Sequence, residues 1–399
     1  MRFAVIVFML NTISLIVSAQ VEFQEHVVAG TESDFMIVKH YKIKGTNFEI
    51  GEKIAEIAIQ MHLSLNPHSD SVINKLQAKY FRVNYPIHYE RMKGIAAGFG
   101  VDYTNFANNA SEITYLPIKT SCSAVFYPKD KTFNNHSILS RNFDFPIGNI
   151  QLQKCKGNEL PALSRPIIFE IYPDQGYPSL YICSFELIGG VLDGINSEGF
   201  SVAILGDGIY NDGFLPDPSY EIGLHELLIM RYLLDNCKNI TEAKEALIYL
   251  KQYYDFAPQH YIIADKEGHS FIFEFSRMRN KSNIIDGSGI QCITNHLISG
   301  QNPGKTPEES KNRLGLLETL TSENKKFTLD EIKNINSRVS PPLTKNCGPD
   351  LEPSRTLWHS IYDMDKKSLL VKFYLGEKNQ ADNSVKVIYS DYYEIKLNK

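Results

Sequence analysis

Two stretches decide the fold of this chain: Thr120-Ser121-Cys122-Ser123-Ala124-Val125 and Ser140-Arg141-Asn142-Phe143-Asp144-Phe145. Both are β-prone, and the polar stretch Lys129–His136 separates them, which predicts a hairpin. If residue 122 pairs with residue 144, the turn is centred on residue 133 and Asp144 lies beside Cys122. Side chains alternate along a strand, so Arg141 is expected on the opposite face from Asp144 unless a bulge intervenes.

Cys122 is the strongest candidate for chemistry in this hairpin. A thiol at a new N-terminus can use its own α-amino group as base, since the pKa of that group is about 7.7–8. Asp144 is suited to orient the ammonium, and Arg141 is suited to favour a thiolate or a developing oxyanion. The alternative for Cys122 is half of a disulfide or an inert buried thiol, which its compartment and the composition alone would favour.

The rest of the chain alternates helical segments with β-prone runs. Residues 46 to about 106 have helical spacing of apolar residues, interrupted near Pro86. After Cys122, hairpins alternate with pairs of helices, which predicts stacked sheets covered by helices. The fold class expected is therefore α+β, in the form of a four-layer helix–sheet–sheet–helix (αββα) sandwich preceded by a helical prosegment. The β-prone runs lie at 167–172, 179–187, 191–195, 200–205, 261–264, 270–275, 356–363 and 368–375, and the helices at 222–236, 241–251, 307–320 and 329–335.

Cys122-Ser123 followed by Ser140-Arg141-Asn142-Phe143-Asp144-Phe145 resembles the signature of the choloylglycine hydrolase and acid ceramidase superfamily of N-terminal-nucleophile hydrolases. Within it, the chain is most similar to the isopenicillin N acyltransferase branch. The run Met92–Phe99 resembles the prosegment motif of that branch, although a small-residue helix face packed on a neighbour explains it equally well. The resemblance extends in order from about residue 40 to 375.

Four further motifs carry the resemblance downstream. Asp193-Gly194-Ile195-Asn196-Ser197-Glu198-Gly199-Phe200 resembles the family's glycine–asparagine turn, so Asn196 is a candidate for substrate or oxyanion support, or a plain turn residue. Thr294-Asn295-His296 resembles the second asparagine motif, and Asn295 is the expected oxyanion donor, with an Asx turn as the alternative. Arg313 is a candidate active-site or surface arginine, and 355–360 resembles the closing strand.

The resemblance implies self-cleavage of the Ser121–Cys122 bond. Residues 20–121 would form a small α chain and residues 122–399 the catalytic β chain, held together as a heterodimer by packing alone because the α segment has no cysteine. Two features depart from the family pattern. Ser121 stands where several relatives have glycine or a β-branched residue, and the tip between Cys122 and Arg141 is longer.

The N-terminus predicts entry into the secretory pathway. Arg2, an apolar run from Phe3 to Val17 and the small residue Ala19 are typical of a signal peptide over residues 1–19, with a retained membrane anchor as the alternative. No other stretch is long enough to span a bilayer. The expected location is secreted or lysosomal, the latter implied by the ceramidase side of the family. Glycosylation sequons begin at Asn109, Asn135, Asn239 and Asn280.

The six cysteines and the charge limit the other functions. No CxxC or Cys/His ligand spacing occurs, so we expect no metal and no cofactor. Disulfides are expected in an oxidising compartment, but if Cys122 stays free then at least one other of the remaining five, Cys155, Cys183, Cys237, Cys292 and Cys347, is unpaired. A Cys–His protease would need a partner among His136, His225, His260, His269 and His296, and none lies in a recognisable motif. The net charge of −5 gives no basic footprint for nucleic acid.

The expected function is hydrolysis of a linear amide bond, with a thioester on Cys122 as intermediate. The partner is then a small-molecule acyl amide such as an N-acyl amine, a ceramide-like lipid or an acyl amino acid. Two alternatives stay open. One is an acyltransferase that passes the acyl group to an amine, and the other is a secreted lipid-binding relative without activity.

Overall fold

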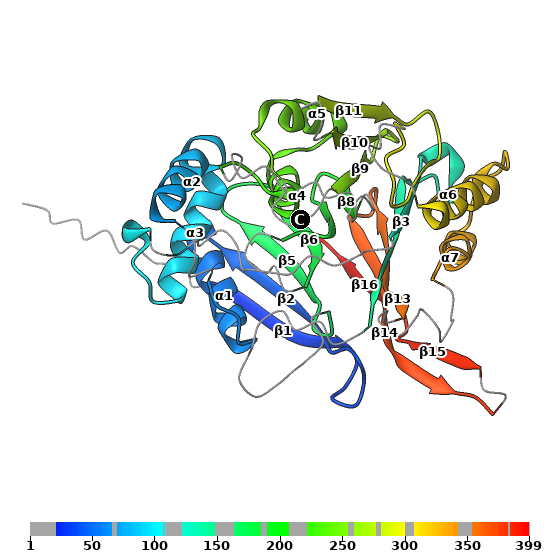
Figure 1. Cartoon of the computed structure of the whole chain (residues 1–399), viewed down its shortest axis with the longest axis horizontal. Helices are drawn as coiled ribbons and strands as arrows, with labels where there is room; N and C mark the ends of the chain where they lie inside the picture. The colour runs from blue at the N-terminus through cyan, green and yellow to red at the C-terminus, as the bar shows by residue number, and fades with distance from the viewer. Residues whose placement is uncertain are drawn as a thin grey trace, which may run out of the picture.

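Two β-sheets lie face to face in the computed structural model, with helices on the outer face of each (Figure 1). The structure describes residues 21–65, 70–106, 108, 122–147, 163–184, 190–206, 222–253, 259–276, 281–299, 307–341, 353–381 and 384–398. Within these ranges no helix is long and apolar enough to cross a membrane. The predicted signal peptide, Ser121 and the sequons at Asn109 and Asn280 lie outside the described residues.

Three helices form the segment that was predicted to be helical: α1 (Asn47–Gln60), α2 (Ser71–Asn84) and α3 (Pro86–Gly98). A capping box starts α1, because the Thr46 hydroxyl accepts from the backbone of Glu49 while the Glu49 carboxylate accepts from the backbone of Thr46. Pro86 occupies the first turn of α3, where its missing N–H costs nothing. The predicted break near Pro86 is therefore confirmed.

Glycines allow α1 and α3 to approach closely. A Cβ added to Gly94 would lie 1.9 Å from the Phe48 carbonyl oxygen, and one added to Gly51 would lie 2.2 Å from that of Arg91. No side chain fits at these distances. The run Met92–Phe99 therefore has the packing role that was the alternative to a prosegment motif, whatever further role it has.

The first sheet has nine strands, and every neighbouring pair is antiparallel except β2 and β5. Helices α1, α4 (Glu226–Asn236) and α5 (Ile240–Tyr249) pack against it. The strands, in spatial order, are β1 (Glu22–Ala29), β2 (Val38–Gly45), β5 (Ile167–Pro173), β6 (Ser179–Cys183), β7 (Asp193–Asn196), β8 (Phe200–Gly206), β9 (Gln259–Asp265), β10 (Ser270–Ser276) and β11 (Lys281–Asp286).

The second sheet is antiparallel and carries the hairpin of Cys122. Helices α6 (Glu308–Thr321) and α7 (Leu329–Ser337) cover its outer face, on the right of Figure 1. Its strands, in spatial order, are β12 (Gln291–Ile293), β3 (Ser123–Tyr127), β4 (Ile138–Pro146), β13 (Ser354–Asp363), β14 (Ser368–Asn379) and β15 (Val385–Tyr389), with β16 (Tyr393–Lys396) paired to β14.

The apolar core between the sheets joins them into one unit. One hydrophobic cluster includes buried side chains of both sheets, among them Ile204 of β8 and Phe143 of β4. The ring of Phe143 stacks on Trp358 of β13, with ring centroids 3.9 Å apart. Helices, two sheets and helices thus follow in layers, and the predicted four-layer α+β architecture is confirmed.

The segment before Cys122 is not purely helical, contrary to the prediction. It also supplies β1 and β2, and β2 pairs in parallel with β5 from the other side of Cys122. Sequence patterning missed β1 because almost all of its side chains are exposed, so it lacks the alternation that marks a half-buried strand. Strands β11, β15 and β16 were also not predicted.

Candidate active site

Cys122 lies immediately before β3 of the second sheet, and its side chain faces the first sheet. Its side chain is 1% exposed, and the guanidinium Nη2 of Arg141 lies 3.7 Å from its sulfur. Its carbonyl oxygen accepts a hydrogen bond of 2.7 Å from Nη1 of Arg313. Residues from β4 and α6 thus reach both ends of Cys122.

The predicted register of the hairpin was wrong by one residue. Ser123 pairs with Asn142, so Cys122 aligns with Phe143 and not with Asp144. The prediction placed residue 133 at the centre of the turn, but the pairing of Ser123 with Asn142 places the centre between residues 132 and 133. As expected, the side chains of Arg141 and Asp144 lie on opposite faces of β4.

Arg141 points between the two sheets and is held from three directions. Its Nη1 lies 3.1 Å from a carboxylate oxygen of Asp193, and its Nη2 donates to the carbonyl of Ile204 at 2.7 Å as well as facing the Cys122 sulfur. Asp193 is fully buried and also accepts a 2.6 Å bond from the Ser360 hydroxyl. A guanidinium fixed in this way faces the thiol with little freedom to move.

Asp193 is a site residue that sequence analysis did not assign. It opens the motif Asp193-Gly194-Ile195-Asn196, and an aspartate within an apolar run was the available signal, because a buried carboxylate needs a partner. Its partner, Arg141, is 52 positions earlier in the chain and on the other sheet. No local pattern links the two.

Asp144 lies on the other face of β4, under α7. It is fully buried, and one carboxylate oxygen accepts a 2.6 Å bond from the Thr356 hydroxyl. The other oxygen, Oδ2, has no hydrogen-bond partner among the described residues. Burial raises the pKa of Asp144 to about 7, although the charge of Arg313 and the hydrogen bond from Thr356 oppose the rise. Asp144 therefore keeps an open, buried carboxylate oxygen, and the charge of this carboxylate acts on Cys122.

The surroundings of Cys122 favour its neutral thiol over the thiolate. Burial raises the pKa of Cys122, while the charge of Arg141 and the backbone N–H of Asp144 act in the opposite direction. Arg313 also lowers this pKa, and the causes found for the shift among the described residues include no histidine. A Cys–His pair of the protease type thus receives no support at Cys122.

Asn295 and Arg313 form the third side of the site. Asn295 follows β12, and its Oδ1 accepts a 2.9 Å bond from Nη2 of Arg313 while its Nδ2 donates to the Gly206 carbonyl at 2.7 Å. An amide nitrogen has two hydrogens, so one donor remains. Arg313 is 7% exposed and pairs with Glu309 one turn away. It is therefore not the solvated surface residue that was the alternative.

Asn196 belongs to a turn, which was the alternative to its predicted role in substrate or oxyanion support. Its Nδ2 donates to the carbonyls of Leu234 and Cys237, and its Oδ1 accepts from the backbone N–H groups of Glu198 and Phe200. Its side chain therefore fixes the β7–β8 turn to the end of α4. The hydrogen-bonding capacity that a substrate would need is already used.

The remaining predicted residues lie away from this site. Asn135 is exposed in the β3–β4 turn, and Asn239 caps the N-terminus of α5. Cys122, Cys237 and Cys292 are free thiols, Cys183 is buried, and Cys155 and Cys347 lie outside the described residues. No disulfide therefore joins the first three, and the pairing expected in an oxidising compartment is not found there. The described residues contain no cluster of three or more metal ligands.

Stacked sheets covered by helices, with a buried cysteine at the start of a strand and an arginine facing its sulfur, are the arrangement expected from the resemblance to N-terminal-nucleophile hydrolases. A family model described as acyl-coenzyme A:6-aminopenicillanic acid acyl-transferase matches residues 133–380. This range is well over half of the chain, and the protein belongs to that family. The matched residues include Arg141, Asp144, Asn295 and Arg313.

Solved structures that match the chain have low sequence identity. A mutant of the conjugated bile acid hydrolase from Clostridium perfringens is 16% identical, with a TM-score of 0.44, over 70% of this chain and 97% of that one. Penicillin V acylase from Agrobacterium tumefaciens is 17% identical, with a TM-score of 0.40, over 68% and 86%. A search of curated protein sequences returned no match.

Proposed function

We propose that this protein is a cysteine amidase that cuts its own Ser121–Cys122 bond and then attacks linear amide bonds with the freed Cys122. The observation that carries the proposal is the open, buried carboxylate oxygen of Asp144, whose charge acts on a cysteine that faces Arg141. A buried, unpaired oxygen is costly, and an ammonium group at Cys122 would satisfy it.

The self-cleavage step needs a base before any free amine exists. Asp144 is suited to this step, because its pKa of about 7 lets it accept a proton near neutrality and its backbone N–H already contacts the thiol. The Cys122 sulfur attacks the Ser121 carbonyl carbon and displaces the Cys122 nitrogen. Water then hydrolyses the resulting thioester, which leaves Ser121 as a carboxylate and Cys122 with a free α-amino group.

Catalysis on a substrate then follows the same bonds. The α-amino group of Cys122 takes the thiol proton, and the sulfur attacks the amide carbonyl carbon. The spare N–H of Asn295 stabilises the oxyanion, and Arg141 favours the thiolate. The ammonium returns its proton to the leaving nitrogen as the C–N bond breaks. A water molecule, deprotonated by the same amine, attacks the thioester, releases the carboxylic acid and restores the thiol.

The two proposed chains share extensive contacts that do not depend on a covalent link. Strand β2 of the small chain pairs with β5 of the large one over seven residue pairs. Arg91 and Tyr85, before the cut, bond to the buried carboxylate of Asp235, after it. These contacts support a stable heterodimer of residues 20–121 and 122–399. We also propose that residues 1–19 are removed as a signal peptide and that the protein is secreted or lysosomal. The exposed position of Asn135 is compatible with glycosylation in that pathway.

The substrate class proposed is an acyl amide, namely an N-acyl amine, a ceramide-like lipid or an acyl amino acid. The family description favours a second candidate, transfer of the acyl group to an amine instead of to water. Both reactions pass through the same thioester, so only their products distinguish them. Adding a primary amine to the assay would yield a new amide from a transferase, and free acid alone from a hydrolase.

N-terminal sequencing and intact mass of the purified protein test the proposal directly. The wild type should give a large fragment that begins at Cys122, and Cys122→Ala should stay whole and inactive against a panel of the three substrate types. Cys292→Ala is the matched control, because that thiol lies in the same sheet and should leave both properties unchanged. An uncut wild type without activity would favour a lipid-binding protein, and an active Cys122→Ala would overturn the mechanism.

A further inference from the structure

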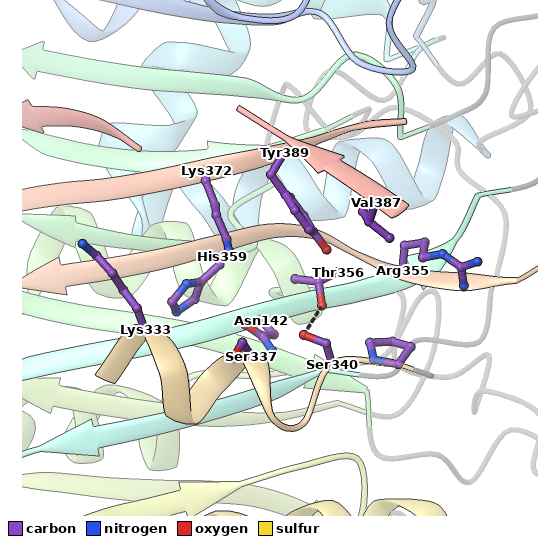
Figure 2. A pocket seen from close by; sticks show the side chains of 11 residues that line it. Asn142, Lys333, Ser337, Ser340, Arg355, Thr356, His359, Lys372, Val387 and Tyr389 are labelled. Carbon is purple, nitrogen blue, oxygen red and sulfur yellow. Dashed lines mark hydrogen bonds between the residues drawn. The ribbon is translucent and has the colours of Figure 1, made fainter. Parts of the chain in front are cut away.

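A cavity of about 320 Å³ lies between α7 and the outer face of the second sheet (Figure 2). It is on the opposite face of β4 from the Arg141 guanidinium, and no step of the proposed reaction uses it. Its walls come from β4, α7 and the segment after it, β13, β14 and β15. The lining residues are Asn142, Lys333, Ser337, Ser340, Pro341, Arg355, Thr356, His359, Lys372, Val387 and Tyr389.

Two lysines give this cavity an excess of positive charge. Figure 2 shows Lys372 extending from its strand towards His359, with Lys333 rising from α7 on the other side of that ring. Both ammonium groups also contact the ring of Tyr392, at 4.7 Å for Lys333 and 5.4 Å for Lys372. Two like charges on one aromatic ring repel each other, so their approach is unfavourable while the cavity holds no anion.

Carboxylates do not offset this charge at Lys372. No ion pair to Lys372 is found among the described residues, although this side chain is half-buried. Lys333 lies 3.2 Å from Asp330, which is 92% exposed and therefore strongly screened by water. Arg355, at the far end of the cavity, is paired with Glu377. Burial and the charge of Lys333 both lower the pKa of Lys372, as expected for a cation without a partner.

His359 fixes the wall of the cavity between the two lysines, and both of its ring nitrogens are already hydrogen-bonded. Its Nε2 bonds to the Ser140 hydroxyl at 2.8 Å and its Nδ1 to the Tyr392 hydroxyl at 2.7 Å. Burial lowers the pKa of His359 to about 3, so the ring is neutral. Three hydroxyls line the same space, but those of Ser337 and Thr356 already donate to the Asn334 carbonyl and to Asp144, which leaves Ser340 as the neutral donor. Two ammonium groups and one hydroxyl around a rigid cavity are suited to an oxyanion.

We propose that this cavity is an anion-binding site, in which Lys333 and Lys372 hold a phosphate, sulfate or carboxylate group. The anion is either free in solution or the charged end of a larger ligand, and the recognising chemistry is the same in both cases. The site does not depend on self-cleavage, so the test of anion binding and the test of the proposed reaction are independent of each other.

Calorimetric titration of the purified protein with inorganic phosphate tests the site. Binding should be saturable and should weaken as chloride is raised, because both charges are partly accessible to solvent. Lys372→Gln and Lys333→Gln should each weaken the binding at least tenfold, and Lys372→Arg should retain it. Lys378→Gln is the matched control, since this exposed lysine lies further along β14 and outside the cavity.

Competition identifies the source of the anion. If phosphate and an N-acyl amino acid compete, the cavity takes the carboxylate of that ligand; if both bind together, it takes a free anion. Either result supports the site. Phosphate binding that is absent, or that is the same in Lys372→Gln and Lys333→Gln as in the wild type, would overturn it. Circular dichroism of each variant separates loss of binding from loss of fold.

Discussion

Two groups of buried charges differ in how completely their carboxylates are paired. In the α3–α4 cluster, Asp235 accepts hydrogen bonds from the Tyr85 hydroxyl and from the guanidinium groups of Arg91 and Arg231. These bonds occupy both of its oxygens, and they lower its pKa against the effect of burial.

The second group is the Cys122 cluster, made of Cys122, Arg141, Asp144, Asp193, Asn295 and Arg313. Here Asp144 keeps one oxygen without a partner among the described residues, and its pKa rises to about 7. Asp144 and Asp235 are equally buried, so burial alone does not explain why the pKa of one is raised and that of the other is lowered. The α3–α4 cluster is arranged to hold helices together, whereas the Cys122 cluster retains the hydrogen-bonding capacity that catalysis requires.

Asp235→Asn should produce the largest loss of stability. Removing one member of a buried, hydrogen-bonded ion pair leaves Arg91 and Arg231 without their counter-charge and costs about 3–5 kcal/mol. Urea denaturation measures the change. The control is Asp286→Asn, whose pair with Lys244 is at the surface and should be worth less than about 1 kcal/mol. A similar small effect for Asp235→Asn would remove the contrast between the clusters.

The pH dependence of stability should reveal the raised pKa of Asp144. Because this pKa is about 7 in the folded chain and near 3.8 ordinarily, the folded chain holds the proton more tightly. This contribution to stability is complete below about pH 4 and is lost as the pH rises through 7, by at most about 4 kcal/mol.

The comparison is made in the uncut Cys122→Ala background, with and without Asp144→Asn. The stability gained from Asp144→Asn should grow between pH 4 and 7 and then level off, since asparagine does not ionise. Urea denaturation at several pH values gives this difference. A difference that is constant with pH would mean that Asp144 has an ordinary pKa.

The two asparagines should separate activity from stability. Asn295→Ala should lower kcat/KM by about 100- to 1000-fold, which corresponds to the loss of one oxyanion donor worth about 2.7–4 kcal/mol. Asn196→Ala should instead destabilise the fold by about 1–3 kcal/mol, because it leaves buried backbone groups unpaired, while the folded enzyme keeps most of its kcat. The reverse pattern would return Asn196 to the site.

Asp193→Asn should have the smallest effect on activity, at about a tenfold decrease in kcat/KM of the folded protein, although removing the buried counter-charge of Arg141 also destabilises the fold. An amide can still accept one hydrogen bond from Arg141, but it no longer holds the guanidinium by charge. The rate of thiol alkylation against pH is the more telling measurement, because a misplaced guanidinium should shift it towards higher pH. An unchanged alkylation profile would show that the Ile204 carbonyl suffices to position Arg141.

The amino-acid sequence by itself determined the local features of this protein. Periodicity, with an interruption near Pro86, located the helical segment before Cys122, and β-prone runs on either side of a polar turn located the hairpin. The residue types near Cys122 also indicated the candidate chemistry. These features depend on residues close together in the chain, so their signal is present in a short window.

Only the tertiary structure decided which distant residues meet. The pairing of Arg141 with Asp193, the reach of Arg313 to Cys122 from 191 positions away and the saturation of Asn196 all join separate elements. The edge strand β1 and the exact register of the hairpin belong to the same group. Strand pairing and buried charge pairs are set by packing across the two sheets, and a one-residue shift in register moves every side chain to the other face.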